Sequence, residues 1–155
     1  MTDRISRAEF MKYTGTTVIG AYAGALLLGG CSAVSTAPLA PEGSYHRDGN
    51  LVIISLPAVD ELRAVGGAVR LEVGNGSGHK ILVVHAAEET YLAYANRCTH
   101  NGKELDYRHE QNRVQCISGK SHFSLDGEVT KGPAGSGLVV YPTHREVDDL
   151  VIEVS

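Results

Sequence analysis

The sequence predicts an all-β domain, and three observations lead to that prediction. Apolar residues come in short segments of about five or six, the usual length of a β-strand. Glycine, asparagine and aspartate separate these segments, and none shows the apolar period of an amphipathic helix. The chain of 155 residues also has 18 glycines, seven tyrosines and no tryptophan, a composition typical of a loop-rich protein. We therefore expect an antiparallel sandwich or barrel-like fold.

The predicted strands follow one another through a single domain over residues 51–155. Turn signals such as Gly66-Gly67 and Asp126-Gly127 separate them. Apolar and charged residues alternate in several of them, which is the pattern of a strand with one buried face. The segment 104–115 is expected to form a hairpin arm. The strands are predicted at 51–56, 68–73, 80–86, 90–95, 113–117, 137–141 and 150–154.

The amino terminus resembles a processing signal. Basic residues precede an apolar run over 17–30 that is too short to span a bilayer comfortably and ends in small residues. Leu28-Gly29-Gly30-Cys31 resembles a bacterial lipobox, whose cysteine is lipidated. We therefore expect residues 1–30 to be an export signal peptide and Cys31 to carry a lipid. The alternative is a buried hydrophobic helix with Cys31 as an ordinary thiol.

The segment that follows the signal is expected to be a flexible tether. Residues 31–50 are rich in small, proline and polar residues and show no period. The lipid on Cys31 would attach this tether to the bilayer and place the domain outside the cytoplasm, at the periplasmic face of a bacterial cell envelope.

Charge argues against nucleic acid as a partner. The chain has 14 basic and 18 acidic residues, for a formal net charge of -4, and the two signs are well mixed. A basic stripe that would follow a phosphate backbone is therefore not expected.

Two glycine-punctuated stretches carry the candidate site. The first places Cys98 and His100 one residue apart, and the second places Cys116 and His122 in a Cys-x5-His spacing. A thiolate and an imidazole from each of two loops is a donor set suited to a metal centre. In an oxidising compartment, however, two close thiols without a metal tend to form a disulfide.

In order and spacing, these stretches resemble the Rieske [2Fe–2S] domain. The resemblance rests on Cys98-Thr-His-Asn-Gly102, on Cys116 after a hairpin, and on the run from Ser121 to Ala134. It covers essentially all of residues 51–155. It implies a Rieske-like antiparallel β-sandwich with a small cluster-binding subdomain made of two loops.

The resemblance also implies where the cluster would lie. The two loops are expected at about 98–103 and 116–123, and a proline loop at about 131–137 would cover the cluster. Cys98, His100 and Cys116 match three of the family's four ligand positions, and Ser121 matches a hydroxyl that hydrogen-bonds a cluster sulfur.

The second ligand motif departs from the family pattern. An ungapped alignment of Cys116 and Phe123 puts Gly119 where the family has its second histidine. His122 is the candidate fourth ligand, because a flexible loop could bend its imidazole back toward the site. The competing interpretation is a surface histidine beside the buried Phe123. High-potential members of the family also have a disulfide between two loop cysteines, and Lys103 and Ser118 stand at those two positions in this chain. A bound cluster is therefore expected to have a lower potential.

Three functions follow from these residues. The first is single-electron transfer through a [2Fe–2S] cluster, with a redox protein at the membrane surface as partner. The second is a degenerate Rieske-fold lipoprotein that binds no cofactor, has a Cys98–Cys116 disulfide and acts as a binding or structural module. The third is a zinc site formed by the two cysteines with His100 and His122.

Catalysis by the chain alone is not expected. No nucleophile with an adjacent base and no pair of acid–base carboxylates stands out in the sequence. A role as the redox subunit of an oxidoreductase complex stays open.

Overall fold

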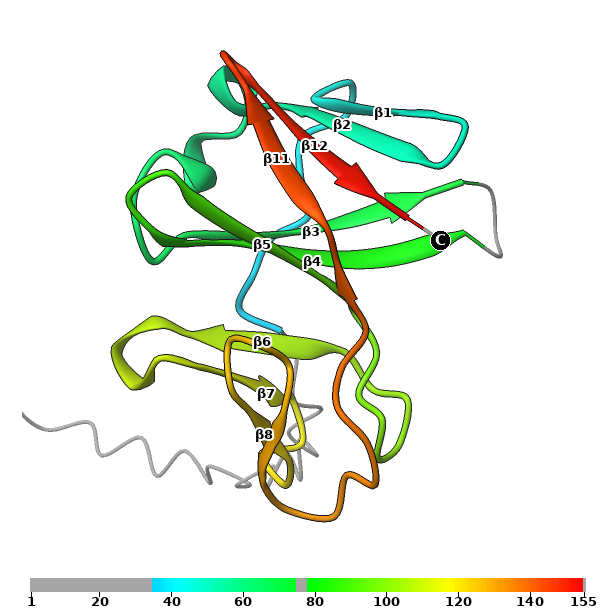
Figure 1. Cartoon of the computed structure of the whole chain (residues 1–155), viewed down its shortest axis with the longest axis vertical. Helices are drawn as coiled ribbons and strands as arrows, with labels where there is room; N and C mark the ends of the chain where they lie inside the picture. The colour runs from blue at the N-terminus through cyan, green and yellow to red at the C-terminus, as the bar shows by residue number, and fades with distance from the viewer. Residues whose placement is uncertain (1–34, 75–77, 155) are drawn as a thin grey trace, which may run out of the picture. The chain divides into compact units, whose positions relative to one another are not determined.

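The all-β prediction is confirmed. The structure, a computed structural model, describes residues 35–74 and 78–154 and contains twelve strands in these residues (Figure 1). Strands pair antiparallel within three four-stranded sheets. No helix in these ranges is long and apolar enough to cross a membrane. The predicted signal peptide 1–30 and Cys31 lie outside the described residues.

The first sheet joins residues from the two ends of the described chain. Its order is β1-β2-β12-β11, so the carboxyl-terminal hairpin pairs with the first strands. Two short 3-10 helices, η1 (Leu56–Ala58) and η2 (Asp60–Leu62), follow β2. The strands are β1 (Tyr45–Asp48), β2 (Leu51–Ser55), β11 (Thr143–Glu146) and β12 (Asp149–Glu153).

The second sheet lies between the other two and has the order β10-β5-β4-β3. Its strands match the predicted segments closely, and β4 and β5 form a hairpin with a register shift between His85 and Ala87. The strands are β3 (Ala68–Val73), β4 (His79–Ala87), β5 (Thr90–Ala95) and β10 (Val140–Tyr141).

The third sheet carries the candidate site. Its order is β6-β7-β8-β9, and the predicted hairpin arm over 104–115 corresponds to β6 and β7 joined by the 3-10 helix η3 (His109–Gln111). The strands are β6 (Leu105–Arg108), β7 (Arg113–Cys116), β8 (His122–Phe123) and β9 (Val129–Lys131).

Strand β4 explains why the middle sheet has a core on each face. Four consecutive residues, Ile81 to Val84, are fully buried. Because neighbouring side chains of a strand point to opposite faces, Ile81 and Val83 join the core shared with the first sheet, whereas Leu82 and Val84 join the core shared with the third. The unbroken apolar run is therefore the pattern of a strand buried on both sides.

The structure differs from the predicted tether over residues 35–50. β1 pairs in register with β2, the Ala37 side chain is buried, and Leu39 forms a bridge with Arg70. The proline and small residues that suggested a tether therefore lie along the domain surface. Their backbone groups find partners in β3 instead of water: the Arg70 N–H donates to the Pro38 carbonyl, and the Ala40 N–H donates to the Arg70 carbonyl.

The same segment connects the second and third sheets. Both the amide and the hydroxyl of Thr36 donate to Asp106 Oδ1 on β6, at 3.1 and 2.6 Å. The Arg70 guanidinium donates to the Ala37 carbonyl at 2.7 Å and pairs with Glu104 at 2.8 Å. Asp106 is 1% exposed and also pairs with Arg108 at 2.6 Å, so its carboxylate is fully engaged.

Replacement of Asp106 by alanine is expected to lower the free energy of unfolding by about 2–4 kcal/mol, because a buried carboxylate, its ion pair with the exposed Arg108 and two hydrogen bonds from Thr36 are lost at once. Urea unfolding of the purified protein measures this loss. Asp106→Asn keeps an oxygen acceptor for Thr36, so its free energy of unfolding should fall by less. If Asp106→Ala lowers the free energy of unfolding no more than the exposed substitution Glu110→Ala, the contacts of Asp106 do not contribute to stability.

Candidate metal centre

Two loops at one end of the third sheet hold the candidate residues. In the first loop, the Gly102 N–H donates to the Cys98 carbonyl at 2.8 Å and the Cys98 N–H to the Lys103 carbonyl at 2.7 Å. In the second, the Gly119 N–H donates to the Cys116 carbonyl at 2.7 Å and the Cys116 N–H to the Ser121 carbonyl at 2.9 Å. Each loop is thus closed by its own backbone, without the disulfide at Lys103 and Ser118.

The two cysteines meet inside this end of the sheet. Cys98 and Cys116 are 1% and 0% exposed, are both free thiols, and belong to the same buried core cluster. Cys116 Sγ also lies 3.0 Å from Ser118 Oγ and 3.5 Å from Asn101 Oδ1. Residues 18 positions apart in sequence are therefore brought into the same buried region.

The surroundings shift the pKa values of the two thiols in opposite directions. Burial raises the pKa of Cys98, and its contact with Cys116 raises it further. Burial also acts to raise the pKa of Cys116, but hydrogen bonds from Ser118 and the charge of Lys103 stabilise its thiolate and bring the pKa below the ordinary value. Cys116 is thus the thiol that ionises first.

His100 and Ser121 each present a polar atom with no partner among the described residues. His100 Nδ1 and Ser121 Oγ are buried and form no hydrogen bond there. Ser121 pairs with Cys116 across the sheet through the backbone, and both side chains lie on the buried face. A buried polar atom without a partner costs about 1–3 kcal/mol, so these atoms are placed to meet a ligand.

His122 lies away from the two thiols. It pairs with Gln115 across β7 and β8, whereas Cys116 is the next residue along β7, so the two side chains are on opposite faces of the sheet. The His122 imidazole instead hydrogen-bonds Arg113 at 3.1 Å. Burial and the charge of Arg113 lower the pKa of His122. Cys98 and His100 thus line one groove and Cys116 is buried with Cys98 in the same core, whereas His122 faces away from them.

The proline loop packs against the second loop. Gly132 has a φ of +95°, and a Cβ there would lie 1.9 Å from the Lys120 carbonyl oxygen, so only glycine allows this approach. The Thr99 hydroxyl donates to the Ser136 carbonyl at 2.6 Å and ties the first loop to the same segment. Ala134 packs on the core beside the cysteines.

No complete metal site is formed by protein atoms alone. Within residues 35–74 and 78–154, no three histidine, cysteine, aspartate or glutamate side chains converge closely enough to hold a single metal ion. A zinc ion held by four side chains is therefore not preformed. A two-iron cluster distributes its ligands over two metals, and Cys98, Cys116 and His100 match three of its four ligands in residue type.

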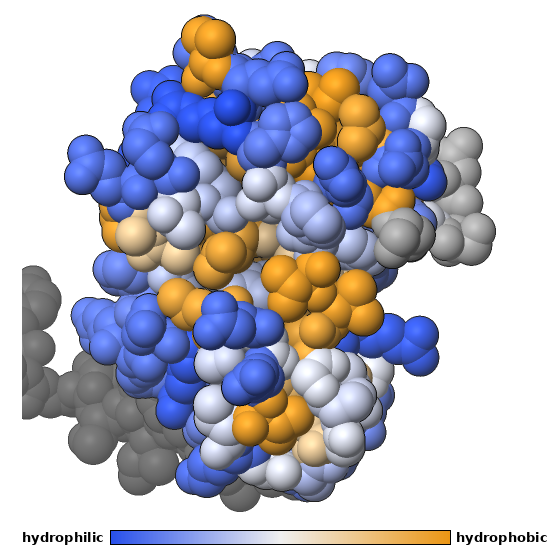
Figure 2. All heavy atoms as spheres, viewed as in Figure 1, coloured by the Kyte–Doolittle hydropathy of each residue, from blue (hydrophilic) through white to orange (hydrophobic). Residues whose placement is uncertain are grey.

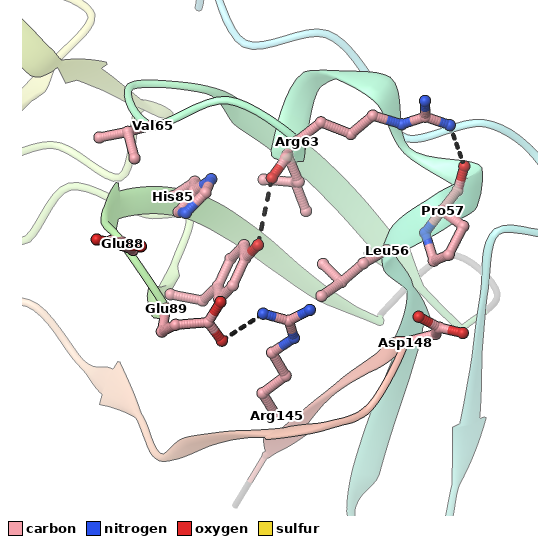
Figure 3. A pocket seen from close by; sticks show the side chains of 11 residues that line it. Leu56, Pro57, Arg63, Val65, His85, Glu88, Glu89, Arg145 and Asp148 are labelled. Atoms are coloured by element: carbon pink, nitrogen blue, oxygen red, sulfur yellow. Dashed lines mark hydrogen bonds and ion pairs between the residues drawn. The ribbon is translucent and has the colours of Figure 1, made fainter.

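A groove and a separate cavity mark the surface. The groove, of about 480 Å³, is lined by residues of the first loop, including Cys98 and His100, and by Ser136 and the half-exposed Val139. The cavity, of about 620 Å³, contains neither cysteine of the site (Figure 3). His85 lines it, stacked on Tyr91 with a ring separation of 4.3 Å. The groove is thus the opening nearest the thiols.

Sequence reasoning missed two polar contacts of Cys116. In the sequence, Ser118 stands out only as a position without a disulfide cysteine, and Asn101 only as a member of the Cys98–Gly102 motif, yet both contact the Cys116 sulfur. A hydroxyl two residues after a cysteine, inside a turn, is a local signal for the first contact. The Asn101 contact depends on how the two loops pack and has no local signal.

Comparisons with known proteins point to the domain family that the sequence resembles. The family model of the Rieske [2Fe-2S] domain matches residues 53–142, more than half of the chain. A comparison with curated proteins finds no match. Among solved structures, the chain is similar to the ferredoxin of carbazole 1,9a-dioxygenase from Nocardioides aromaticivorans IC177, at 15% identity and a TM-score of 0.53, over 66% of this chain and 95% of that one.

A second similar structure is the cyanobacterial plasma membrane Rieske protein PetC3 from Synechocystis PCC 6803. Its identity to this chain is 24% and its TM-score 0.47, over 56% of this chain and 86% of that one. At such identities the ferredoxin likeness supports the fold, and the ligand positions have to be judged on this chain's own residues.

Replacement of Ser118 by alanine is expected to raise the pKa of Cys116 in the metal-free protein, because the thiolate loses its hydroxyl donor. Ultraviolet thiolate absorbance, recorded across pH, measures the change. Ser118→Thr keeps the hydroxyl and serves as the matched control. An unchanged first ionisation in Ser118→Ala would show that another group stabilises the thiolate.

Proposed function

The chain belongs to the Rieske [2Fe-2S] domain family, and we propose that it transfers single electrons through a [2Fe–2S] cluster held by its two site loops. Family membership supports an electron-transfer role. Cys98, Cys116 and His100 would supply three protein ligands. His122 is left out of this set because its imidazole lies on the other face of β8 and hydrogen-bonds Arg113.

The observation that carries the proposal is the pair of buried free thiols, Cys98 and Cys116, together with a buried nitrogen of His100 that has no partner among the described residues. Thiolates are the ligands that iron–sulfur clusters require, and a neutral imidazole is the other donor of this family. When bound, the cluster would accept and return one electron. The protein's own part is to bury the thiols and to keep the His100 nitrogen free for coordination.

Hydrogen bonds and charge would tune the potential. Ser121 Oγ is buried without a partner beside Cys116, where it would donate to a cluster sulfur. The hydroxyl of Ser118 and the charge of Lys103 stabilise the Cys116 thiolate. The disulfide of high-potential members has no counterpart at Lys103 and Ser118, so we propose a lower potential and easier loss of the cluster.

A second candidate function is a Rieske-fold module without a cluster. Gly119 favours it, because a glycine at the position of the family's second histidine cannot supply an imidazole. The adjoining thiols of Cys98 and Cys116 could then oxidise to a disulfide outside the cytoplasm. Under this alternative the unpartnered nitrogen of His100 has no explanation, and for that reason we rank it second.

A redox protein is the partner that fits the groove beside His100. Val139, which lines the groove, is 54% exposed, and Val129 and Val140 are also exposed. Apolar side chains lie between charged ones on the face seen in Figure 2. An apolar surface next to the ligand edge would let a partner approach closely enough for electron transfer. The chain could serve this role alone or as the redox subunit of an oxidoreductase complex.

Export and lipidation at Cys31 complete the proposal. Five residue-to-residue steps separate Cys31 from Thr36, and they span at most about 18 Å. Thr36 is anchored to Asp106 of the third sheet. A lipid on Cys31 would therefore keep the sheet that carries the site close to the bilayer, within reach of membrane-surface redox partners.

The cluster is tested by reconstitution of the purified chain with iron and sulfide. We expect visible absorption of a [2Fe–2S] cluster and a reduced-state EPR signal. Cys98→Ser and Cys116→Ser should abolish both, because each removes a thiolate ligand. His122→Ala should leave them unchanged. A colourless protein with a Cys98–Cys116 disulfide would contradict the electron-transfer role and favour the module without a cluster.

Lipidation is tested by replacement of Cys31 with serine. The natural chain, expressed in a bacterium that processes lipoproteins, is expected in the membrane fraction and in the detergent phase after partition. Cys31→Ser should move to the aqueous phase. Equal partition of the two proteins would contradict the proposed anchor.

A further inference from the structure

A second opening of the molecule lies apart from the candidate metal centre. It is the cavity of about 620 Å³, whose walls come from the 3-10 helices after β2 and from the turns that join β4 to β5 and β11 to β12 (Figure 3). Small-molecule sites in proteins have volumes of roughly 300–1,000 Å³. No residue of the two cysteine loops lines this cavity. It therefore has the size of a ligand site and is separate from the thiols.

The floor of the cavity is apolar except for His85. Leu56, Leu62 and Tyr91 line it and are buried. His85 is 6% exposed, and neither of its ring nitrogens has a hydrogen-bond partner among residues 35–74 and 78–154. Its ring is stacked on Tyr91, with 16° between the two planes. Because a neutral imidazole has one N–H and one lone pair, His85 keeps a donor and an acceptor unused beside the cavity.

The rim of the cavity has an excess of negative charge. Arg63 and Arg145 line it, and each is already paired with a carboxylate. Glu88 and Asp148 also line it and form no ion pair within the described part of the chain. In Figure 3, Glu88 lies on the His85 side of the cavity and Asp148 on the opposite side. Unpaired carboxylates around an apolar cavity favour a ligand with a positive charge.

Val65 stands between solvent and the imidazole. The His85 nitrogens are closed to water, and Val65 lies beside the ring in Figure 3 and is 45% exposed. The backbone of this turn is fixed, because the Gly66 N–H donates to the His85 carbonyl at 2.8 Å and the His85 N–H donates to the Gly67 carbonyl at 2.9 Å. Rotation of the half-exposed Val65 side chain is therefore the smallest movement that would open the nitrogens to a ligand.

We propose that this cavity binds a small organic cation, namely an amine on an apolar or aromatic body. The apolar body would lie on the floor formed by Leu56 and Leu62. With Val65 turned aside, the ammonium group would lie between His85 and Glu88, where it would donate one hydrogen bond to the unprotonated imidazole nitrogen and pair with the carboxylate. This inference does not depend on a bound cluster.

The test is a titration of the purified natural chain with benzylamine, followed in nitrogen–proton NMR spectra that include the His85 ring nitrogens. Benzyl alcohol and benzoate are the uncharged and the anionic probes of similar size. We expect saturable shifts of His85 and Tyr91 with benzylamine, and binding about tenfold weaker for benzyl alcohol, because it lacks the charge-assisted contacts. Benzoate should not saturate these signals.

Three variants test the assigned roles. His85→Phe keeps a ring against Tyr91 and removes both nitrogens, and Glu88→Gln removes the charge with little change of shape. Each should weaken benzylamine binding about tenfold. Val65→Ala uncovers the imidazole and should bind benzylamine at least as tightly as the natural chain. Glu128→Gln is the matched control, because Glu128 is exposed and lies outside the cavity, and its affinity should be unchanged.

Several results would overturn the proposal. One is the absence of saturable shifts at His85 and Tyr91 with benzylamine in the natural chain. Equal binding of benzyl alcohol, or tighter binding of benzoate, rejects a cation as the ligand. If His85→Phe does not fold, Glu88→Gln decides, and an unchanged affinity for benzylamine contradicts the proposed contact. Equal weakening by Glu88→Gln and Glu128→Gln would show general attraction to an acidic protein without a site.

Discussion

Burial of the middle sheet on both faces is the constraint on which the rest of the structure depends. Strand β4 sends Ile81 and Val83 into the core of the sandwich and Leu82 and Val84 into the core beneath the site. Burial of apolar area stabilises by about 25 cal/mol per Å², so each face needs a partner layer. The third sheet is the partner on one face, and the site loops extend from it.

The site loops depend on close contacts that only particular residues allow. Gly132 brings the proline loop against the Lys120 carbonyl, and Thr99 ties the first loop to Ser136. Backbone hydrogen bonds close each cysteine turn. With no disulfide at Lys103 and Ser118, these backbone hydrogen bonds close the two loops.

Strand alternation decides which of the candidate donors can act together. Cys116 and Ser121 share the buried face of the third sheet, and His122 falls on the other face, where Arg113 holds it. Cys98, His100, Cys116 and Ser121 are therefore the residues of this chain that match the Rieske pattern, whereas Gly119 stands where the family has its second histidine.

The sequence by itself determined the all-β class, most strands and the two cysteine loops, because these depend on local periodicity, turn residues and motif spacing. It could not determine that residues 35–50 pack on the domain, since proline and small residues suit a surface segment as well as a tether. Only the tertiary structure decided on which face of the third sheet His122 lies. Its face is set by the register of β7 with β8, and a pairing between strands leaves no trace in the spacing of one loop.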